Sequence, residues 1–311
     1  MDGILHDAFD GQVEDAFILD HKQGSVFKGW RVGMKKDVMI IWLGYADDLL
    51  IVSETEEGLE KLMKRLDDAM MKWGMNVNSK KTKVMVMGDV DGKMMPKIVL
   101  KSGALDVVKD FSYLGSIVTA DSRIDREVEE RIAKASRTFE RLQRPVWKRH
   151  ELSLTTKMAI YRTCVLSSLL YGSETWTLLA GHTRRLEAFH HRCLRRIQRV
   201  SWMQKMTNEE IRKRAKMGTL DCMMRQRRLQ WFGHIQRMDD DRLPKIILDS
   251  RPKDKSRPFT GSRTKWMDVI WKDMTATGIR YDEAPKLISD RKNWRTIIKN
   301  MAALVPQQQA N

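Results

Sequence analysis

Cysteine, long apolar runs and a leader-like N-terminus are sparse or missing in this 311-residue chain. Its three cysteines, Cys164, Cys193 and Cys222, lie far apart and form no disulfide framework. No run of about 18 apolar residues occurs, so we expect no membrane-spanning helix. The start, Met1-Asp2-Gly3, is acidic and lacks the basic and apolar stretches of a signal peptide. These absences predict an intracellular protein, nuclear or cytoplasmic, with no membrane anchor and no disulfide partner.

Positive charge is abundant, and it is placed unevenly. The net charge is +16, with −3 in residues 1–120 and +19 in residues 121–311. A strongly basic segment favours a polyanionic partner, most simply nucleic acid, although a solvated basic surface is the alternative. The hydrophobic content of 42% supports a core, and the length allows about two domains of roughly 150 residues each.

The first 120 residues are patterned mainly as short strands around one helix. Residues 38–52 predict a strand, a tight turn and a second strand, with Asp47 and Asp48 at the tip. A helix follows, opened by a capping box at residues 53–56 and stopped by Gly74. Further strands are expected at residues 83–87, 97–101, 105–108 and 111–118. Those at 97–101 and 105–108 should form a small hairpin around residues 102–104, and the last should bend at Gly115.

After residue 121 the apolar residues recur at helical spacing. We expect helices over residues 124–142, 154–171, 183–199, 207–217, 219–237, 264–276 and 290–302. The Pro-, Ser- and Gly-rich stretch 250–263 predicts a linker. The chain thus divides into a strand-rich part (1–120), a basic helical part (121–249), the linker (250–263), and short C-terminal helices with a disordered tail (264–311).

The adjacent carboxylates of Asp47 and Asp48 interrupt two apolar runs, and like charges side by side resist burial. A turn exposes both. Two carboxylates on a hairpin can help to hold the divalent ions of phosphoryl or nucleotidyl transfer, although such sites normally need a further carboxylate from a neighbouring strand. An ordinary acidic turn is the alternative.

The order of the motifs around this turn resembles the second half of a reverse transcriptase palm. Tyr45-Ala46-Asp47-Asp48 is similar to the catalytic hairpin of that family. The stretch from Gly74 to Thr82, with its Asn-x-x-Lys-Thr, resembles the next palm element, and residues 111–115 the strand turn that grips the primer. With the later stretches LQRPVWKR, LYGSETWTL, RRLQWFGHIQRM and KNWRTII, the chain looks closest to non-LTR (LINE-type), RTE-like retrotransposon enzymes, from near residue 1 to about 300.

This resemblance implies an RNA-directed DNA polymerase that uses Mg²⁺ or Mn²⁺, deoxynucleoside triphosphates, an RNA template and a DNA primer. Asp47 would bind metal, Asp48 would assist, and Lys81 would lie near the triphosphate. A solvated lysine is the alternative for Lys81. The residues that would support the primer, with core packing as the alternative for the first two, are Tyr113, Leu114 and Gly115.

The sequence departs from the family's pattern before the hairpin. The first palm strand should carry a metal-binding Asp six residues before the Asp of Ala-Phe-Asp, but Ile4 stands six residues before Asp10. Only 37 residues separate Asp10 from Asp48, too few for the nucleotide pocket. We therefore predict an α+β fold: an incomplete reverse transcriptase palm, made of a small antiparallel sheet with a packed helix, then a mainly α-helical thumb and C-terminal region. We expect this fragment to be inactive alone.

The basic helices give two further candidate sites. Arginines gather on one face of the helix at 183–199 and continue beyond it, which favours phosphate binding over a solvated face. The set is Arg185, Arg192, Arg195, Arg196, Arg199, Arg225, Arg227 and Arg228. A zinc site from His190, Cys193, Cys222 and His234 is disfavoured because the paired ligands of such sites are missing. Two other functions stay open: a non-catalytic nucleic-acid-binding relic, and a helical module for an acidic protein partner.

Overall fold

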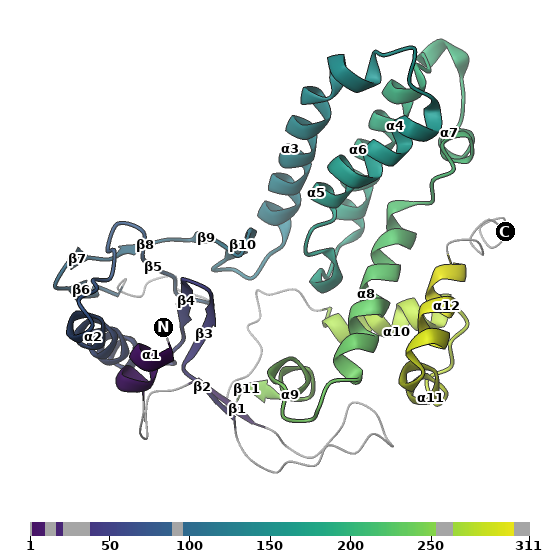
Figure 1. The fold of residues 1–311 in the computed structure, drawn as a ribbon. Coiled ribbons are helices and arrows are strands. Elements are labelled where there is room, and N and C mark those ends of the chain that lie inside the picture. The colour runs from purple at the N-terminus through teal and green to yellow at the C-terminus, as the bar shows by residue number, and fades with distance from the viewer. Residues whose placement is uncertain (1, 10–16, 21–37, 89–95, 253–263, 302–311) are drawn as a thin grey trace. The chain divides into compact units, whose positions relative to one another are not determined.

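A computed structural model describes residues 2–9, 17–20, 38–88, 96–252 and 264–301 (Figure 1). The chain forms two compact units. Unit 1 contains residues 1–122 and 238–261, and unit 2 contains residues 123–237 and 262–311. Residues 238–249 thus group with the strand-rich unit, whereas the sequence placed them with the basic helices.

Unit 1 is built around two helices, α1 (Asp2–Phe9) and α2 (Glu56–Lys72), which lie side by side in Figure 1. Helix α2 begins at Thr55, whose side chain accepts a hydrogen bond from the Gly58 backbone N–H at 3.0 Å. The expected capping box at residues 53–56 is therefore replaced by a single cap. The helix ends before Gly74, which takes the left-handed backbone (φ +71°) as predicted. The shared core contains Ile4, Leu5, Phe9, Leu62, Met63 and Leu66.

The strands of unit 1 pair in small sheets. Strand β1 (Phe17–Asp20) lies between β2 (Val38–Ile40) and β11 (Arg251–Pro252), antiparallel to both. Strands β3 (Trp42–Tyr45) and β4 (Asp48–Ile51) form the predicted hairpin. Because β11 falls within 250–263, part of the expected linker is a strand; residues 253–263 lie outside the described part. Helix α9 (Leu243–Asp249) precedes β11.

The later strands differ from expectation in two places. Strands β6 (Val99–Leu100) and β7 (Gly103–Ala104) make a short hairpin, but β8 (Asp106–Val107) pairs in parallel with β5 (Lys83–Val84). Residues 110–119 are not one bent strand. They form a hairpin of β9 (Asp110–Tyr113) and β10 (Ser116–Thr119), because Leu114 and Gly115 both take positive φ and turn the chain.

Unit 2 is helical within the described residues, as the periodicity predicts. Its α-helices are α3 (Asp125–Arg141), α4 (Leu154–Ile160), α5 (Ser167–Leu169), α6 (Ala180–Gln198), α7 (Asn208–Ala215), α8 (Leu220–Gln236), α10 (Trp266–Ala276), α11 (Ala284–Ser289) and α12 (Arg291–Met301). Two π-helical turns, η1 (Gln143–Trp147) and η2 (Tyr161–Leu166), continue α3 and α4, and two 3₁₀ turns, η3 (Ser173–Thr175) and η4 (Trp202–Gln204), complete it. Ser153 and Thr207 cap the N-termini of α4 and α7 through their side chains.

The core of unit 2 centres on α6, which buries an apolar face formed by Leu186, Phe189, Leu194 and Ile197. Helix α3 contributes Phe139, whose ring stacks on Trp147 of η1 with centroids 5.2 Å apart. The Trp147 indole N–H donates to the Phe139 carbonyl at 2.8 Å, so the polar atom of this large side chain is satisfied inside the core. The guanidinium of Arg196 on α6 lies over the Phe139 ring, 5.1 Å from its centroid, so this cluster extends to the last turn of α6.

The prediction of an α+β chain is confirmed at the level of helices and small sheets, with most strands before residue 122 and most helices after it. Among the described helices, none is long and apolar enough to cross a lipid bilayer. All three cysteines are free thiols, with Cys164 exposed and Cys193 and Cys222 buried.

Candidate active site and nucleic-acid interface

The acidic pair lies at the tip of the β3–β4 hairpin. Tyr45 pairs with Asp48 across the strands, which leaves Ala46 and Asp47 as the two turn residues. Ala46 takes a left-handed backbone with φ +53°. Both carboxylates are exposed, and Tyr45 keeps 67% of its surface accessible. The turn therefore presents two oxygen-bearing side chains to solvent, where each can meet a cation without a desolvation cost.

Lys81 stands at the end of a turn that Asn78 organises. The Asn78 carbonyl accepts from the backbone N–H of Lys81 at 3.1 Å and of Thr82 at 2.9 Å, and its side-chain oxygen accepts from Lys81 N–H at 3.2 Å. The Asn of Asn-x-x-Lys-Thr thus has a local structural role. The Lys81 side chain is exposed, and no described ion pair joins it to Asp47 or Asp48. Its proposed role at a triphosphate stays a prediction.

The β9–β10 turn brings Tyr113 near the acidic hairpin. Burial raises the pKa of the Tyr113 phenol, and the negative charge of Asp48 raises it further. Leu114 and Gly115 form the two-residue turn beyond it, with φ +46° and +82°. Asp48 and Tyr113, which lie 65 positions apart in the sequence, are therefore close enough for the charge of Asp48 to act on the phenol. Leu114 is 39% exposed, so core packing does not account for it fully.

The donor set fits only part of a divalent metal site. Two carboxylates offer the hard oxygen ligands that Mg²⁺ prefers, and Mg²⁺ usually takes one or two of these together with substrate phosphates. Within the described residues, no group of three or more His, Cys, Asp or Glu side chains could surround an ion. Asp47 and Asp48 therefore suit one side of such a site.

The disfavoured zinc set meets an unsuitable environment. His190 accepts or donates a hydrogen bond with the Tyr161 hydroxyl at 2.9 Å, and burial lowers its pKa to about 3. Burial also raises the pKa of the Cys193 thiol to about 12. Zinc binds thiolate, so a thiol held neutral in an apolar core is a poor ligand. These groups serve the core of unit 2.

Three exposed arginines lie on the predicted face of α6, and two of them pair with acids. Arg185 donates to Glu129 at 3.2 Å, and Arg196 pairs with Glu140; both acids lie on α3. Arg192 is exposed, with its guanidinium 5.6 Å from the centroid of the Phe189 ring on the same helix. Exposed pairs of this kind are weak, so these arginines can exchange a carboxylate for a phosphate at small cost.

Arg195 and Arg199 contact backbone carbonyls. Arg195 donates to the Met206 carbonyl at 2.7 Å, which ties α6 to the loop before α7. Arg199 ends α6 in a left-handed conformation, and its Nη2 donates to the Lys148 carbonyl at 2.8 Å. Each guanidinium keeps further N–H donors, but each also has a structural role that the helical spacing alone did not indicate.

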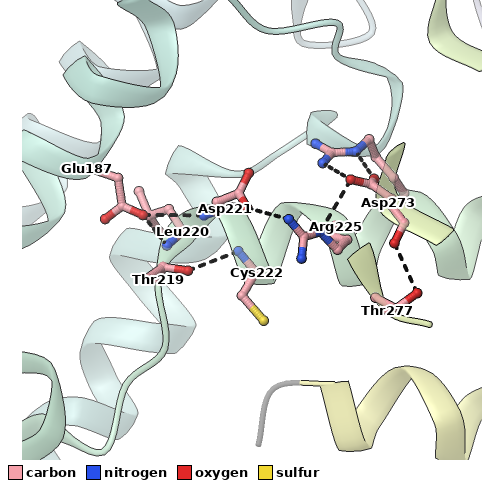
Figure 2. A network of polar contacts seen from close by, with 9 residues as sticks. Glu187, Thr219, Leu220, Asp221, Cys222, Arg225, Asp273 and Thr277 are labelled. Carbon is pink, nitrogen blue, oxygen red and sulfur yellow. Dashed lines mark hydrogen bonds and ion pairs between the residues drawn. The ribbon is translucent and has the colours of Figure 1, made fainter. Parts of the chain in front are cut away.

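The arginines of α8 correct the prediction in part (Figure 2). Arg225 lies between Asp221 at 2.8 Å and Asp273 at 3.4 Å. Arg228 is 4% exposed and donates to both carboxylate oxygens of Asp273, at 2.6 and 3.0 Å. Arg228 is therefore a buried ion-pair residue that joins α8 to α10, and it is not available to a phosphate. Arg227 donates to the Leu170 carbonyl at 2.9 Å.

Figure 2 also shows Glu187, a partly buried acid of α6, at the start of α8. The Glu187 carboxylate accepts from the backbone N–H of Leu220 at 2.7 Å and of Asp221 at 3.3 Å, while Thr219 accepts from Cys222 N–H at 3.2 Å. Burial raises the pKa of Glu187, and the backbone donors oppose that rise. Glu187, which lies in the middle of the otherwise basic helix α6, thus completes the N-terminal cap of α8.

Two basic residues near the end of α6 were missed. His150 and Lys157 line a pocket there together with Arg199 and Arg214. The four residues come from separate segments, so no spacing within one helix could reveal them. Only the packing of α4 and α7 against α6 brings them together.

Known proteins give an independent view of the chain. Residues 22–118 match the family described as "Reverse transcriptase (RNA-dependent DNA polymerase)". This segment contains the β3–β4 hairpin, the Asn78 turn and most of the β9–β10 hairpin.

Curated relatives extend the similarity. An uncharacterized transposon-derived protein of Caenorhabditis elegans is 25% identical over 268 residues, which cover 83% of this chain and 94% of that protein. The RNA-directed DNA polymerase from mobile element jockey of Drosophila melanogaster is 24% identical over 54% of this chain, and that of Drosophila funebris 22% over 51%. No solved structure matches the chain.

Residues 22–118 of the chain are therefore similar to the reverse transcriptase family, and about half of the chain is similar to polymerases of mobile elements. The matched part of the chain spans only about a fifth of the length of the two jockey polymerases, 18% and 19%. The reverse transcriptase match, residues 22–118, lies within the first segment of unit 1 and ends before the helices of unit 2 begin.

Proposed function

We propose that this chain is the C-terminal part of a LINE-type, RTE-like reverse transcriptase, an RNA-directed DNA polymerase. The hairpin of unit 1 supplies part of its metal site, and unit 2 is the thumb and C-terminal region that binds the RNA template and DNA primer. The observation that carries the first half is the exposed Asp47–Asp48 tip beside Tyr113, inside the segment that matches the reverse transcriptase family.

Asp47 has the better position for a metal ligand, because it is a turn residue free of strand pairing, whereas Asp48 begins β4. When bound, Mg²⁺ or Mn²⁺ would lower the pKa of the attacking hydroxyl and offset charge on the phosphates. The β9–β10 turn would meet the primer end next to Asp48. Two carboxylates hold two ions poorly, so the described residues alone do not polymerise.

The test of the hairpin uses a chimera in which residues 38–122 replace the aligned segment of the Drosophila melanogaster jockey polymerase. Asp47→Asn should abolish turnover in primer extension on RNA and leave template affinity unchanged, because the carboxylate acts in the transition state. Glu57→Gln, an exposed acid on α2, is the matched control. Near-normal turnover in Asp47→Asn would remove the assignment. The unmodified 311-residue chain should extend no primer with either ion.

Nucleic-acid binding by unit 2 is supported by the net charge of +19 after residue 121 and by the acid-paired arginines of α6. Each phosphate contact should add about −0.7 to −0.9 to the slope of log K against log salt. In the full chain, replacing Arg185, Arg192 and Arg196 by Gln should flatten that slope by roughly two to three units, for all sequences alike.

The matched control for this experiment is Lys64, Arg65 and Lys72→Gln on α2, which removes the same charge from an exposed face of unit 1. Circular dichroism should show that both triple variants keep their helices, since Gln is a good helix former. An equal, small effect of both variants would mean that the α6 face is only solvated. The reading as a module for an acidic protein partner would then be favoured.

A further inference from the structure

The strongest feature outside the sites above is the pocket at the C-terminal end of α6. It is lined by His150, Leu154, Lys157, Ile197, Gln198, Arg199 and Arg214. Leu154 and Ile197 form its apolar part, while four side chains carry nitrogen donors that are positive or can become so. No acidic side chain lines it. The pocket thus concentrates positive charge in a concave site.

Lys157 is the most unusual member, since it is only 6% exposed. Its ammonium donates to the Trp147 carbonyl at 3.2 Å and to the Arg149 carbonyl at 2.5 Å. Burial lowers its pKa, and the charge of Arg199 lowers it further; the exposed Glu151 opposes them weakly. A lysine ammonium has three donors, so one remains beyond the two carbonyls. A charge buried without a carboxylate is costly unless an anion joins it.

Arg199 is held beside Lys157 although their charges repel. Its Nη2 donates to the Lys148 carbonyl at 2.8 Å, and its Nη1 lies 2.8 Å from the His150 ring nitrogens. The left-handed backbone at Arg199 (φ +57°) is a strained state for an L-residue, and it turns the chain out of α6 at this point. Backbone contacts therefore fix two cations in a geometry that is unfavourable without a counter-ion.

Gln198 joins α6 to α7 at the wall of the pocket. Its Nε2 donates to the Ile211 carbonyl at 2.9 Å, but its Oε1 is buried and has no hydrogen-bond partner. A buried acceptor without a donor is costly. The residue thus lines the pocket while one of its polar atoms is left unsatisfied by the described part of the chain.

We propose that this pocket binds a single phosphate group, supplied by a nucleic-acid backbone. The inference rests on the proposed nucleic-acid binding by unit 2 and adds to it a defined position for one backbone phosphate. Unlike the exposed arginines of α6, which meet a backbone from one side, the pocket surrounds one phosphate with Lys157, Arg199 and Arg214. A multiply hydrogen-bonded phosphate is the anion that such converging donors recognise.

The experiment compares Arg214→Gln with Lys213→Gln in the full chain. Both residues are exposed on α7 and carry the same charge, but only Arg214 lines the pocket. Binding of 16-nucleotide RNA and DNA is measured over a salt series, and binding of inorganic phosphate is measured by calorimetry. Arg214→Gln should weaken oligonucleotide binding about fivefold to tenfold and reduce the slope of log K against log salt by about one phosphate contact. Lys213→Gln should change both quantities by less than half as much.

Inorganic phosphate should also compete with RNA in the wild type, at constant ionic strength, and much less in Arg214→Gln. Equal effects of the two substitutions, with no competition by phosphate, would overturn the pocket while leaving general nucleic-acid binding intact. If the wild type bound phosphate through Arg214 but bound neither oligonucleotide, the proposed function of unit 2 would fail, and the phosphate would come from a small molecule. Arg199→Gln serves as a second variant, checked for helicity because Arg199 also holds the Lys148 carbonyl.

Discussion

The buried ion pair between α8 and α10 allows the sharpest stability prediction. Asp273 is 4% exposed, and its carboxylate accepts from Arg228 at 2.6 and 3.0 Å and from Arg225 at 3.4 Å. Asp273→Asn keeps the shape of the side chain but leaves the buried guanidinium of Arg228 without its countercharge. Removing one partner of a buried pair costs about 3 to 5 kcal/mol. Because domains are stable by only about 5 to 15 kcal/mol, this loss should be large.

Urea unfolding of the full chain, followed by far-ultraviolet circular dichroism, measures the effect. Asp282→Asn is the matched control, because Asp282 makes the same kind of pair with Arg280 on the surface, where the side chains are 63% and 71% exposed. That control should change stability little, because exposed ion pairs are weak. The double variant Arg228→Met with Asp273→Leu should recover most of the loss. An Asp273→Asn protein no less stable than Asp282→Asn would refute the reasoning.

Three further outcomes follow from the structure. Burial lowers the pKa of His190 to about 3, so as pH falls below about 6.5 the unfolded chain takes up this proton before the folded chain does. The free energy of unfolding should therefore fall by about 1 kcal/mol per pH unit between pH about 6.5 and about 3. In His190→Gln, unfolding curves measured over the same pH range should show a smaller pH dependence. Asp48→Asn should lower the pKa of Tyr113 in an ultraviolet titration, in which Tyr113→Phe identifies the transition that belongs to Tyr113. An unchanged pKa would show that the charge of Asp48 does not act on the Tyr113 phenol. Leu114→Asn should raise the urea midpoint by stabilising the turn about 0.5 to 1 kcal/mol, since Asn tolerates positive φ; a lower midpoint would contradict this.

The elements with strong local patterns could be predicted from sequence. The two apolar runs around Asp47–Asp48 required a turn between them, and the helical spacing gave α2, α3, α6 and α8 to within a few residues. Gly74 correctly marked the end of α2, because glycine readily takes the left-handed backbone conformation that follows many helices. In each case the signal lies within about twenty residues and depends on one type of period or one turn.

The misses arise where the deciding partner is distant or atypical. The β9–β10 turn was hidden because Leu114, an apolar and bulky residue, occupies a position where Asn or Gly is usual. The helical spacing of α8 could not tell that Arg228 points into the core, since its partner Asp273 lies 45 residues later. The pocket at the end of α6 needed three helices to pack before its cations met.

The candidate site was predicted more completely in residue types than in geometry. Asp47, Asp48 and Tyr113 were singled out by motif, but their proximity depends on how the two hairpins pack in unit 1. The role of Asn78 in shaping the Lys81 turn was also not foreseen, although Asn next to small polar residues commonly forms such turns.

The β3–β4 hairpin has a consequence for how the chain meets other chains. Among the described residues this sheet has two strands. The outer edge of each strand therefore has backbone donors and acceptors that no other strand in the described part of the chain uses. Isolated hairpins are marginally stable, and unpaired edges are templates for a further strand. A segment that added itself to β3 or β4 would make the acidic tip more rigid. Without such a segment, the same edges would pair with other copies of this protein, so self-association should increase as the protein concentration rises.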